Sequence, residues 1–240
     1  MKVIAPMAGI CNSDFLLKLI PYGFNTVTLG GYNIDEKSIA AGEKIIERGR
    51  KEFNYPLEDI FSHIESESKR IKENSDVKVS CNLRSCDPKN IIKVSKIKSV
   101  DIVEINCHCR QEELTSIGCG QSMLSRLDLE DYINTVVANS KSEVSVKIRG
   151  NVEGVNNLDV AGKIEDAGAD YIHVDAMKLN HGADLDLIRE ISENTNLYII
   201  GNNSIKSLED CRNMLDSGAN GISIGRATIK GSLDFDLNQL

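Results

Sequence analysis

The stretch Gly168-Ala169-Asp170-Tyr171-Ile172-His173-Val174 contains a helix-ending signal followed directly by a strand-forming run. Glycine suits the left-handed position that ends a helix, and Tyr, Ile and Val favour a β-strand. Just before this stretch, Leu158, Ala161 and Ile164 recur at helical spacing. Gly218-Ala219-Asn220 followed by Gly221–Ile224 repeats the same order later in the chain. The two stretches therefore predict a recurring joint between a helix and a strand.

Similar joints precede Thr26 and Ile102, and recurring joints of this kind are what a βαβ array requires. We expect eight strands, at Lys2–Ala8, Thr26–Gly30, Val77–Leu83, Ile102–Cys107, Val144–Arg149, Tyr171–Asp175, Leu197–Asn202 and Gly221–Gly225. The chain has 240 residues, close to the usual length of an eight-fold barrel. The pattern predicts an α/β fold, a (β/α)8 TIM barrel forming one domain over residues 1–240; a doubly wound open sheet is the alternative.

Composition narrows the class of protein further. Hydrophobic residues make up 41% and charged residues 27%, as in an ordinary globular domain. No apolar run approaches the length of a bilayer span, and no signal peptide opens the chain, so we expect a cytoplasmic protein. The seven cysteines are an odd number, which favours reduced thiols. The net charge of -8 is unlike the basic surplus of most proteins that bind nucleic acid.

Two glycine-containing stretches follow the last two expected strands. The first is Gly201–Ile205, and the second is Gly225-Arg226. In barrels of this type, the loops after strands 7 and 8 commonly bind phosphate through backbone N–H groups. Arg226 adds a positive charge suited to bidentate contacts. A plain turn with a surface arginine is the alternative, but the two loops together favour a phosphate site.

Two polar residues lie inside strand-forming runs. Alternation places Ser145, Lys147 and Arg149 on one face of their strand, and Lys147 at the interior needs an anionic partner. A Schiff-base lysine and a cation that stabilises a reduced flavin or a phosphate both fit this position. His173 lies in line with Lys147, where a core histidine and a functional one are equally consistent with the pattern.

The run Cys107-His108-Cys109 raises the question of a metal centre. Structural zinc sites use four ligands, usually in pairs such as Cys-x₂-Cys. Here the pair is Cys-x-Cys and no second pair follows, so we predict no metal site. Six cysteines do lie near the ends of the first, third and fourth expected strands, and a cluster there is the alternative.

From Ala5 to about Ile229 the chain resembles the dihydrouridine synthases and, more distantly, the dihydroorotate dehydrogenases. The opening Ala5-Pro6-Met7-Ala8-Gly9-Ile10 is similar to the Ala-Pro-Met-Ala-Gly-Val of the synthases. Glu104–Cys109 resembles their Asn-x-Gly-Cys-Pro segment. The other matching segments, in the same order as in the family, are Val79–Pro88, Gly118–Gly120, Val146–Arg149, His173, Asn202–Ser204 and Gly225-Arg226.

This resemblance implies an FMN-dependent oxidoreductase that reduces or oxidises the 5,6 bond of a uracil-type ring. It implies that FMN is held by Pro6, Met7, Ala8, Asn82, Lys147, His173, Asn202, Asn203, Ser204, Gly225 and Arg226. Asn106 would orient the ring and Cys109 would be the general acid. The implied partners are a pyrimidine-like substrate, with tRNA and a nicotinamide reductant as candidates. Alternatives are a dihydroorotate dehydrogenase-like enzyme acting on a free small molecule and a non-redox, phosphate-binding barrel.

Several positions depart from the family pattern. Asn82 stands where the synthases have Gln, and His108-Cys109-Arg110 replaces Gly-Cys-Pro. The chain ends at Leu240, without the C-terminal helical domain with which the synthases hold tRNA, so we expect weak, salt-sensitive tRNA binding or a need for a partner protein. Alternation predicts that Asn106 points to the barrel mouth and Cys107 away from it. The long connection from Cys109 to Leu127 is typical of a lid.

Overall fold

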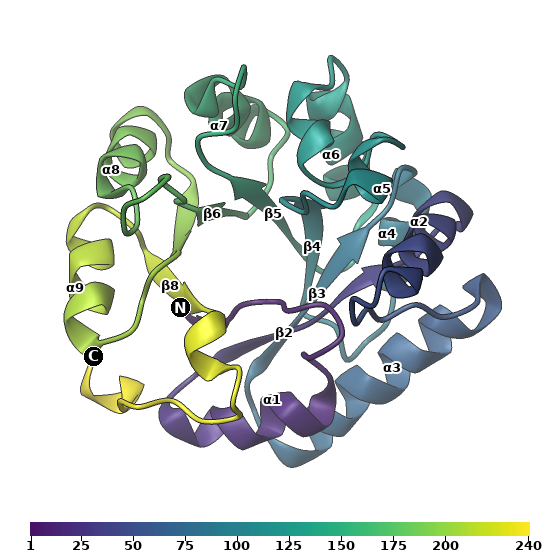
Figure 1. Cartoon of the computed structure of the whole chain (residues 1–240), viewed down its shortest axis with the longest axis horizontal. Helices are drawn as coiled ribbons and strands as arrows, with labels where there is room; N and C mark the ends of the chain where they lie inside the picture. Colours follow the sequence, from purple (N-terminus) through teal and green to yellow (C-terminus); the bar gives the residue numbers. More distant parts are fainter.

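The computed structural model describes residues 1–240 and forms a closed barrel of eight parallel strands arranged in sequence order (Figure 1). The pairing of the first strand with the last closes the barrel, which confirms the (β/α)8 prediction and rules out the open sheet. The strands are β1 (Lys2–Ile4), β2 (Thr26–Asn33), β3 (Lys78–Arg84), β4 (Ile102–Cys107), β5 (Glu143–Arg149), β6 (Tyr171–Asp175), β7 (Tyr198–Asn202) and β8 (Gly221–Ile224).

Two strands differ from their predicted bounds by more than one residue at an end. β1 ends at Ile4 rather than Ala8, because Pro6 has no N–H to donate to a sheet and the chain then turns, with the N–H of Ile10 bonded to the carbonyl of Met7 at 3.0 Å. β2 continues past Gly30 to Asn33 through a register shift. The early end of β1 frees the segment that follows it to line the barrel mouth.

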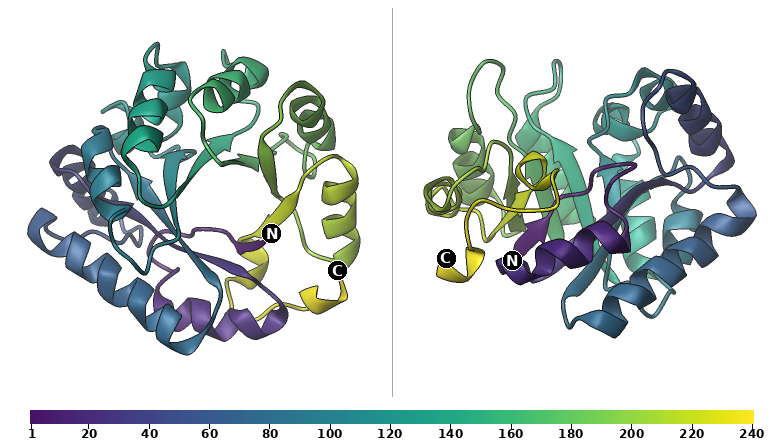
Figure 2. Two further views of the ribbon diagram at one scale, coloured as in Figure 1. Left: turned by 180° about the vertical axis from the view of Figure 1, so that it is seen from behind. Right: turned by 60° about the horizontal axis from the view of Figure 1, so that its bottom comes forward.

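The helices form a ring around the barrel, as seen from opposite sides in Figure 1 and in the left view of Figure 2. They are α1 (Ser13–Leu19), α2 (Glu36–Glu47), α3 (Leu57–Asn74), α4 (Pro88–Val94), α5 (Glu112–Thr115), α6 (Leu129–Asn139), α7 (Asn157–Asp166), α8 (Leu185–Asn194) and α9 (Leu208–Asp216). Ala161 and Ile164 of the predicted apolar stripe are buried in α7, and Ile60, Ile64 and Ile71 of α3 are buried in the same way. None has the length and apolarity that crossing a membrane demands.

The ring is completed by the last segment of the chain. Short 3-10 helices at Arg226–Thr228 (η3) and Leu237–Gln239 (η4) occupy the place between α9 and α1 where an eighth long helix would lie (Figure 1). Leu233 and Leu237 are buried there, and the Nζ of Lys2 donates to the carbonyl of Leu237 at 2.7 Å. The two ends of the chain are therefore held together.

Alternation along the central strands separates an apolar outside from a polar inside. Ile105 of β4 and Val174 of β6 belong to the main hydrophobic core. Glu104, Lys147 and His173 lie on the opposite faces of their strands and are nevertheless buried. Because the interior of this side of the barrel is polar, its side chains must be paired with one another or with a ligand.

The connection after β4 contains two short helices, α5 and η2 (Gly120–Ser125). Leu114 is fully buried and packs with Ala41 and Ile45 of α2, while Met123 joins the main core. The segment predicted as a lid is thus built from helical turns anchored on α2 and the barrel.

Candidate active site at the barrel mouth

A cavity of about 910 Å³ opens at the carboxyl ends of the strands, where barrels of this type carry their chemistry. Its size lies within the range of roughly 300–1,000 Å³ typical of small-molecule sites. Every residue that the sequence singled out as catalytic or cofactor-binding lines this cavity except His173. The lining members are Pro6, Met7, Ala8, Asn82, Asn106, Cys109, Lys147, Asn202, Asn203, Ser204, Gly225 and Arg226.

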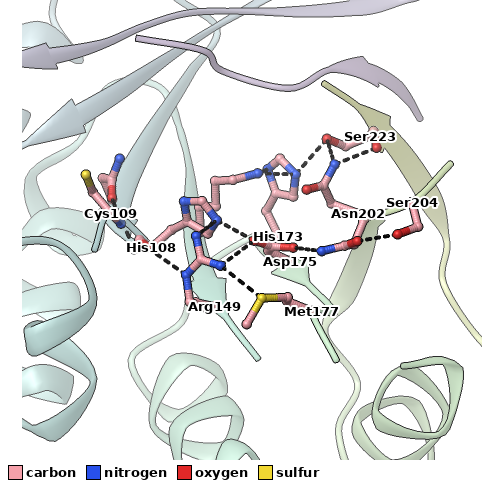
Figure 3. A network of polar contacts seen from close by, with 12 residues as sticks. His108, Cys109, Arg149, His173, Asp175, Met177, Asn202, Ser204 and Ser223 are labelled. Carbon is pink, nitrogen blue, oxygen red and sulfur yellow. Dashed lines mark hydrogen bonds and ion pairs between the residues drawn. The ribbon is translucent and has the colours of Figure 1, made fainter. Parts of the chain in front are cut away.

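His173 lies directly beneath this cavity and is fully buried. Its Nδ1 is 2.7 Å from Oε2 of Glu104. Its Nε2 is 2.7 Å from Nζ of Lys147 and 2.8 Å from Oγ of Ser223, and Figure 3 shows the contact with Ser223. Burial and then the charge of Lys147 lower the pKa of His173. A neutral imidazole that donates from Nδ1 to the carboxylate and accepts at Nε2 satisfies these contacts, so His173 supports Lys147 from below.

Lys147 and Glu104 form the charged centre of the barrel interior. Burial, only partly offset by the carboxylates of Glu104 and Asp175, lowers the pKa of Lys147 to about 8. Burial opposes the ionisation of Glu104, but His173 and Lys147 outweigh it and hold the pKa of Glu104 at about 2. Near pH 7 the pair is therefore a lysine cation facing the cavity and a carboxylate below it.

Glu104 also fixes two amide side chains. Nδ2 of Asn82 donates to Oε1 of Glu104 at 2.7 Å, which leaves Oδ1 of Asn82 to accept from Nδ2 of Asn106 at 2.7 Å. Oδ1 of Asn106 then accepts from the backbone N–H groups of His108 at 3.1 Å and Cys109 at 2.8 Å. A single buried carboxylate thus sets the orientation of both amides and the backbone position of Cys109.

The two neighbouring cysteines face different surroundings. Cys107 is fully buried with its Sγ 4.0 Å from Sδ of Met123, and burial raises its pKa to about 12. Cys109 lines the cavity, and its carbonyl accepts from the N–H of Gln121 at 2.8 Å. A Cβ on Gly120 would lie 2.3 Å from that carbonyl oxygen, and Gly120 has a φ of +64°, so only glycine suits this close contact.

A second polar cluster, formed by His108, Asp175 and Arg149, lies beside Cys109 (Figure 3). Nε2 of His108 is 2.5 Å from Oδ2 of Asp175, and Nη1 of Arg149 is 3.2 Å from the same oxygen. Burial, against the effect of Asp175, lowers the pKa of His108 to about 4. Burial opposes ionisation of Asp175, but its hydrogen bond with His108 and the nearby charges hold its pKa below the usual range. The cluster is thus a neutral histidine oriented by a carboxylate.

The sequence prediction did not assign a role to this cluster or to Glu104. His108 stands where the family's Gly-Cys-Pro has glycine, and this departure was the available signal for the cluster. Glu104 shares the inward face of Asn106, which was also readable from alternation. The pairing of His108 with Asp175 joins the loop after β4 to β6, and no local pattern predicts a contact between segments that are not adjacent in the barrel.

The loops after β7 and β8 form an anion cradle. Asn203 and Ser204 have left-handed φ values of 111° and 54°, and the N–H groups of these two residues and of Gly225 donate to no group of the chain. Nδ2 of Asn202 donates to the carbonyl of Ser223 at 2.7 Å and holds the two loops together. Arg226 opens η3, is exposed and lines the cavity. Free N–H groups beside an arginine suit a phosphate.

These residues fit a phosphorylated flavin, because the cavity offers an anion cradle on one side and a buried cation, Lys147, at its floor. Nowhere in the chain do three His, Cys, Asp or Glu side chains gather as metal ligands. The fold and this mouth define a closed α/β barrel with a polar cavity at the carboxyl ends of its strands. The family model of dihydrouridine synthase matches residues 57–231, and the chain belongs to this family.

Several proteins are similar to this chain in sequence. An uncharacterized protein of Methanocaldococcus jannaschii is 36% identical over 97% of this chain and 91% of its own length. A tRNA-dihydrouridine(20a/20b) synthase-like protein of Mus musculus is 27% identical over 55% of this chain and 44% of its own. The catalytic subunit of dihydroorotate dehydrogenase B from Bacillus cytotoxicus is 26% identical over 56% and 50%. The chain thus spans half or less of the length of these last two relatives.

Proposed function

We propose that this protein is an FMN-dependent oxidoreductase that reduces, or in reverse oxidises, the 5,6 bond of a uracil-type ring. The observation that carries this proposal is the position of Cys109 and Asn106 in one cavity with Lys147 and the phosphate cradle. Family membership supports the same chemistry, since the matching model is that of dihydrouridine synthase.

The residues of the cradle would hold the phosphate of the cofactor. Backbone N–H groups of Asn203, Ser204 and Gly225 supply hydrogen bonds, and Arg226 supplies the charge. The remaining contacts predicted for the cofactor come from Pro6, Met7, Ala8, Asn82, Lys147, His173 and Asn202. His173 would act indirectly, by positioning Lys147. When bound, the flavin supplies or accepts the hydride of the reaction.

The protein's own groups would supply the rest of the reaction. Cys109 delivers a proton from its thiol to one ring carbon while the other carbon receives the hydride, so the double bond becomes saturated. One N–H of Asn106 is committed to Asn82, and the other is free to donate to a ring carbonyl. Lys147, with a pKa of about 8, remains cationic near pH 7 and stabilises negative charge that develops beside it.

Two sources of the ring are candidates. The relative from Mus musculus is named for a tRNA substrate, which makes a tRNA uridine one candidate, with a nicotinamide nucleotide as the reductant. The net charge of -8 predicts that the chain alone binds tRNA weakly and with steep salt dependence, or with a partner protein. The second candidate is a free small molecule, as for the relative from Bacillus cytotoxicus. The charged residues that line the cavity favour this second candidate.

The test is flavin reoxidation under anaerobic conditions. Protein loaded with FMN is photoreduced and mixed with tRNA lacking dihydrouridine, or with a free pyrimidine, and the flavin absorbance is followed. We expect reoxidation by a substrate with a uracil-type ring, matched by loss of the ring's 5,6 double bond. A chain that takes up no flavin, but binds inorganic phosphate at the cradle, would instead support the non-redox barrel.

A further inference from the structure

The cavity is basic although the chain as a whole is acidic. Its net charge is -8, yet far more cationic than anionic side chains line the cavity. The cationic lining residues are Arg50, Arg84, Arg110, Lys147, Arg149, Lys206 and Arg226, against Asp175 and Asp234. Arg226 belongs to the anion cradle, and Lys147 lies at the floor of the cavity, where the proposed flavin would bind. Arg149 pairs with Asp175. Arg84 and Arg50, in contrast, share the single carboxylate of Glu52.

Arg84 is the most deeply placed of these arginines. It is the last residue of β3, it is 3% exposed, and it shares the inward face with Asn82. Its Nη1 donates to Oε2 of Glu52 at 2.7 Å and to Oδ1 of Asn33 at 3.4 Å. Its Nε is buried without an acceptor, and its Nη2 also donates to no group of the chain. A buried guanidinium with free donors is costly unless a ligand supplies the missing acceptors.

Two features hold this arginine in place. The side chain of Glu52 is fully buried and accepts from both Arg84 and Arg50, the latter at 2.9 Å, so the three groups together carry one positive charge. A Cβ on Gly31 would lie 2.6 Å from Oδ1 of Asn82 and 3.3 Å from Nε of Arg84. Glycine at position 31 therefore keeps the approach to both side chains open.

This arginine pair, Arg84 with Arg50, is separate from the phosphate cradle. In the closed barrel β3 is as far around the ring from β7 as two strands can be, whereas β3 pairs directly with β4, which ends at Cys107. Arg84 at the end of β3 and Cys109 just after β4 both line the cavity. An anion at the arginine pair would consequently lie on the side of the cavity where the proton donor is, and not where the cofactor phosphate would bind.

We propose that the substrate is a small planar molecule bearing its own oxyanion, a carboxylate or a phosphate, which binds to Arg84 and Arg50. The inference rests on the proposed function, because the ring must lie between Cys109 and the cofactor. Arg84 is reached only by a group that enters the cavity, and an acidic group on or next to the ring can do so. The phosphates that link the nucleotides of an RNA strand stay outside the cavity with the rest of the strand. Preferential binding of RNA is therefore the outcome that competes with this proposal.

Calorimetric titration with a matched set of ligands tests this proposal, on both FMN-loaded and flavin-free protein. The probes are uracil, orotate, uridine 5′-monophosphate and a short oligouridylate. We expect orotate or the mononucleotide to bind at least about tenfold more tightly than uracil. This difference in affinity corresponds to the free energy of one charge-assisted hydrogen bond. Orotate as the tighter ligand identifies a carboxylate, and the mononucleotide identifies a phosphate. Equal binding of uracil and both anions, or tighter binding of oligouridylate than of either, overturns the proposal.

Variants separate the arginine pair from the general charge of the cavity. Arg84→Gln with Glu52→Gln removes one charge of each sign and should abolish the preference for the anion while leaving the FMN content unchanged. Arg110→Gln is the control, because it removes an exposed cation of the same cavity, and we expect a change below about threefold. A preference that survives the double substitution contradicts the proposal. A chain that binds the anions but never takes up FMN refutes the proposed redox function instead.

Discussion

The two sides of the barrel mouth are built in different ways. On the β3–β6 side, Glu104, His173 and Lys147 are buried and joined by side-chain hydrogen bonds of 2.7 to 3.3 Å, and Asn82 links the buried Asn106 to Glu104. On the β7–β8 side, the groups that line the cavity include free backbone N–H groups and the exposed Arg226. The first side fixes the geometry of a few reactive groups, and the second offers anchoring contacts to a phosphate.

The two sides should therefore respond differently to substitution. A buried network of charges adds little net stability to a fold, because the cost of desolvation offsets most of the attraction. Removing one member is nevertheless strongly destabilising, because it leaves a buried charge without a partner. Changes on the β3–β6 side should lower turnover or stability, whereas changes on the β7–β8 side should lower cofactor affinity and leave the chain folded.

The largest effect is expected at Cys109. General acids contribute about 10²–10⁴-fold to rate, so Cys109→Ala should lose turnover on that scale and still bind FMN. Cys107→Ala is the matched control, since Cys107 faces Met123 in the core, and its turnover should fall much less. The measurement is the rate of flavin reoxidation by substrate in both variants. Equal losses, or a loss confined to the Cys107 variant, would remove Cys109 from its proposed role.

The next effect concerns stability. Glu104→Ala leaves Lys147 without its buried counter-ion and should destabilise the fold by about 3–5 kcal/mol. Glu143→Ala, which breaks the half-exposed pair with Lys78, should cost about 0–1 kcal/mol. Urea unfolding of the two variants measures both values. A Glu104 variant as stable as the Glu143 variant would mean that the network is not tightly coupled.

A smaller effect is expected at the cradle. Arg226→Ala removes one charge-assisted contact, worth about 1.5–3 kcal/mol, and should weaken FMN binding roughly 10- to 100-fold without altering stability. Arg189→Ala, on the exposed face of α8, serves as the control. Quenching of flavin fluorescence on titration gives both affinities. An unchanged affinity in the Arg226 variant would show that the phosphate binds elsewhere.

The smallest effect is a dependence of FMN affinity on pH. The pKa of Lys147 in the free protein is about 8, and negative charge on a bound ligand would raise it. Binding above pH 8 then requires uptake of a proton, so affinity should be flat from pH 7 to 8 and fall by up to about tenfold per pH unit beyond. Lys147→Met should bind more weakly and lose this dependence. A wild-type affinity that rises with pH would contradict the assignment.

The strands were predictable where apolar runs follow a glycine-ended helix, as at Tyr171 and Gly221. The predicted ends of β1 and β2 were wrong because single residues were ambiguous. β1 ends before Pro6 although the apolar pattern continues beyond it. β2 runs through Gly30 and Gly31, although two glycines resemble a turn. The interior positions of Lys147 and Asn106 followed from simple alternation.

The partners of these residues were not predictable. Glu104 reaches His173 across 69 positions of sequence, and Asp175 reaches His108 across 67. Arg84 finds Glu52 in the connection between α2 and α3, which has no regular structure to indicate its position. Each of these contacts depends on how distant segments meet at the mouth, and a single sequence carries no periodic signal for that.

The central claim, that the barrel mouth is an FMN site, is tested most directly by reconstitution. Purified protein is incubated with excess FMN, freed of unbound flavin, and examined for flavin absorbance and stoichiometry. We predict one FMN bound non-covalently per chain, with a shifted spectrum, and its loss from the Arg226→Ala variant at low flavin concentration. A folded wild-type chain that retains no flavin, and whose addition leaves the FMN spectrum unchanged, would contradict the proposed function.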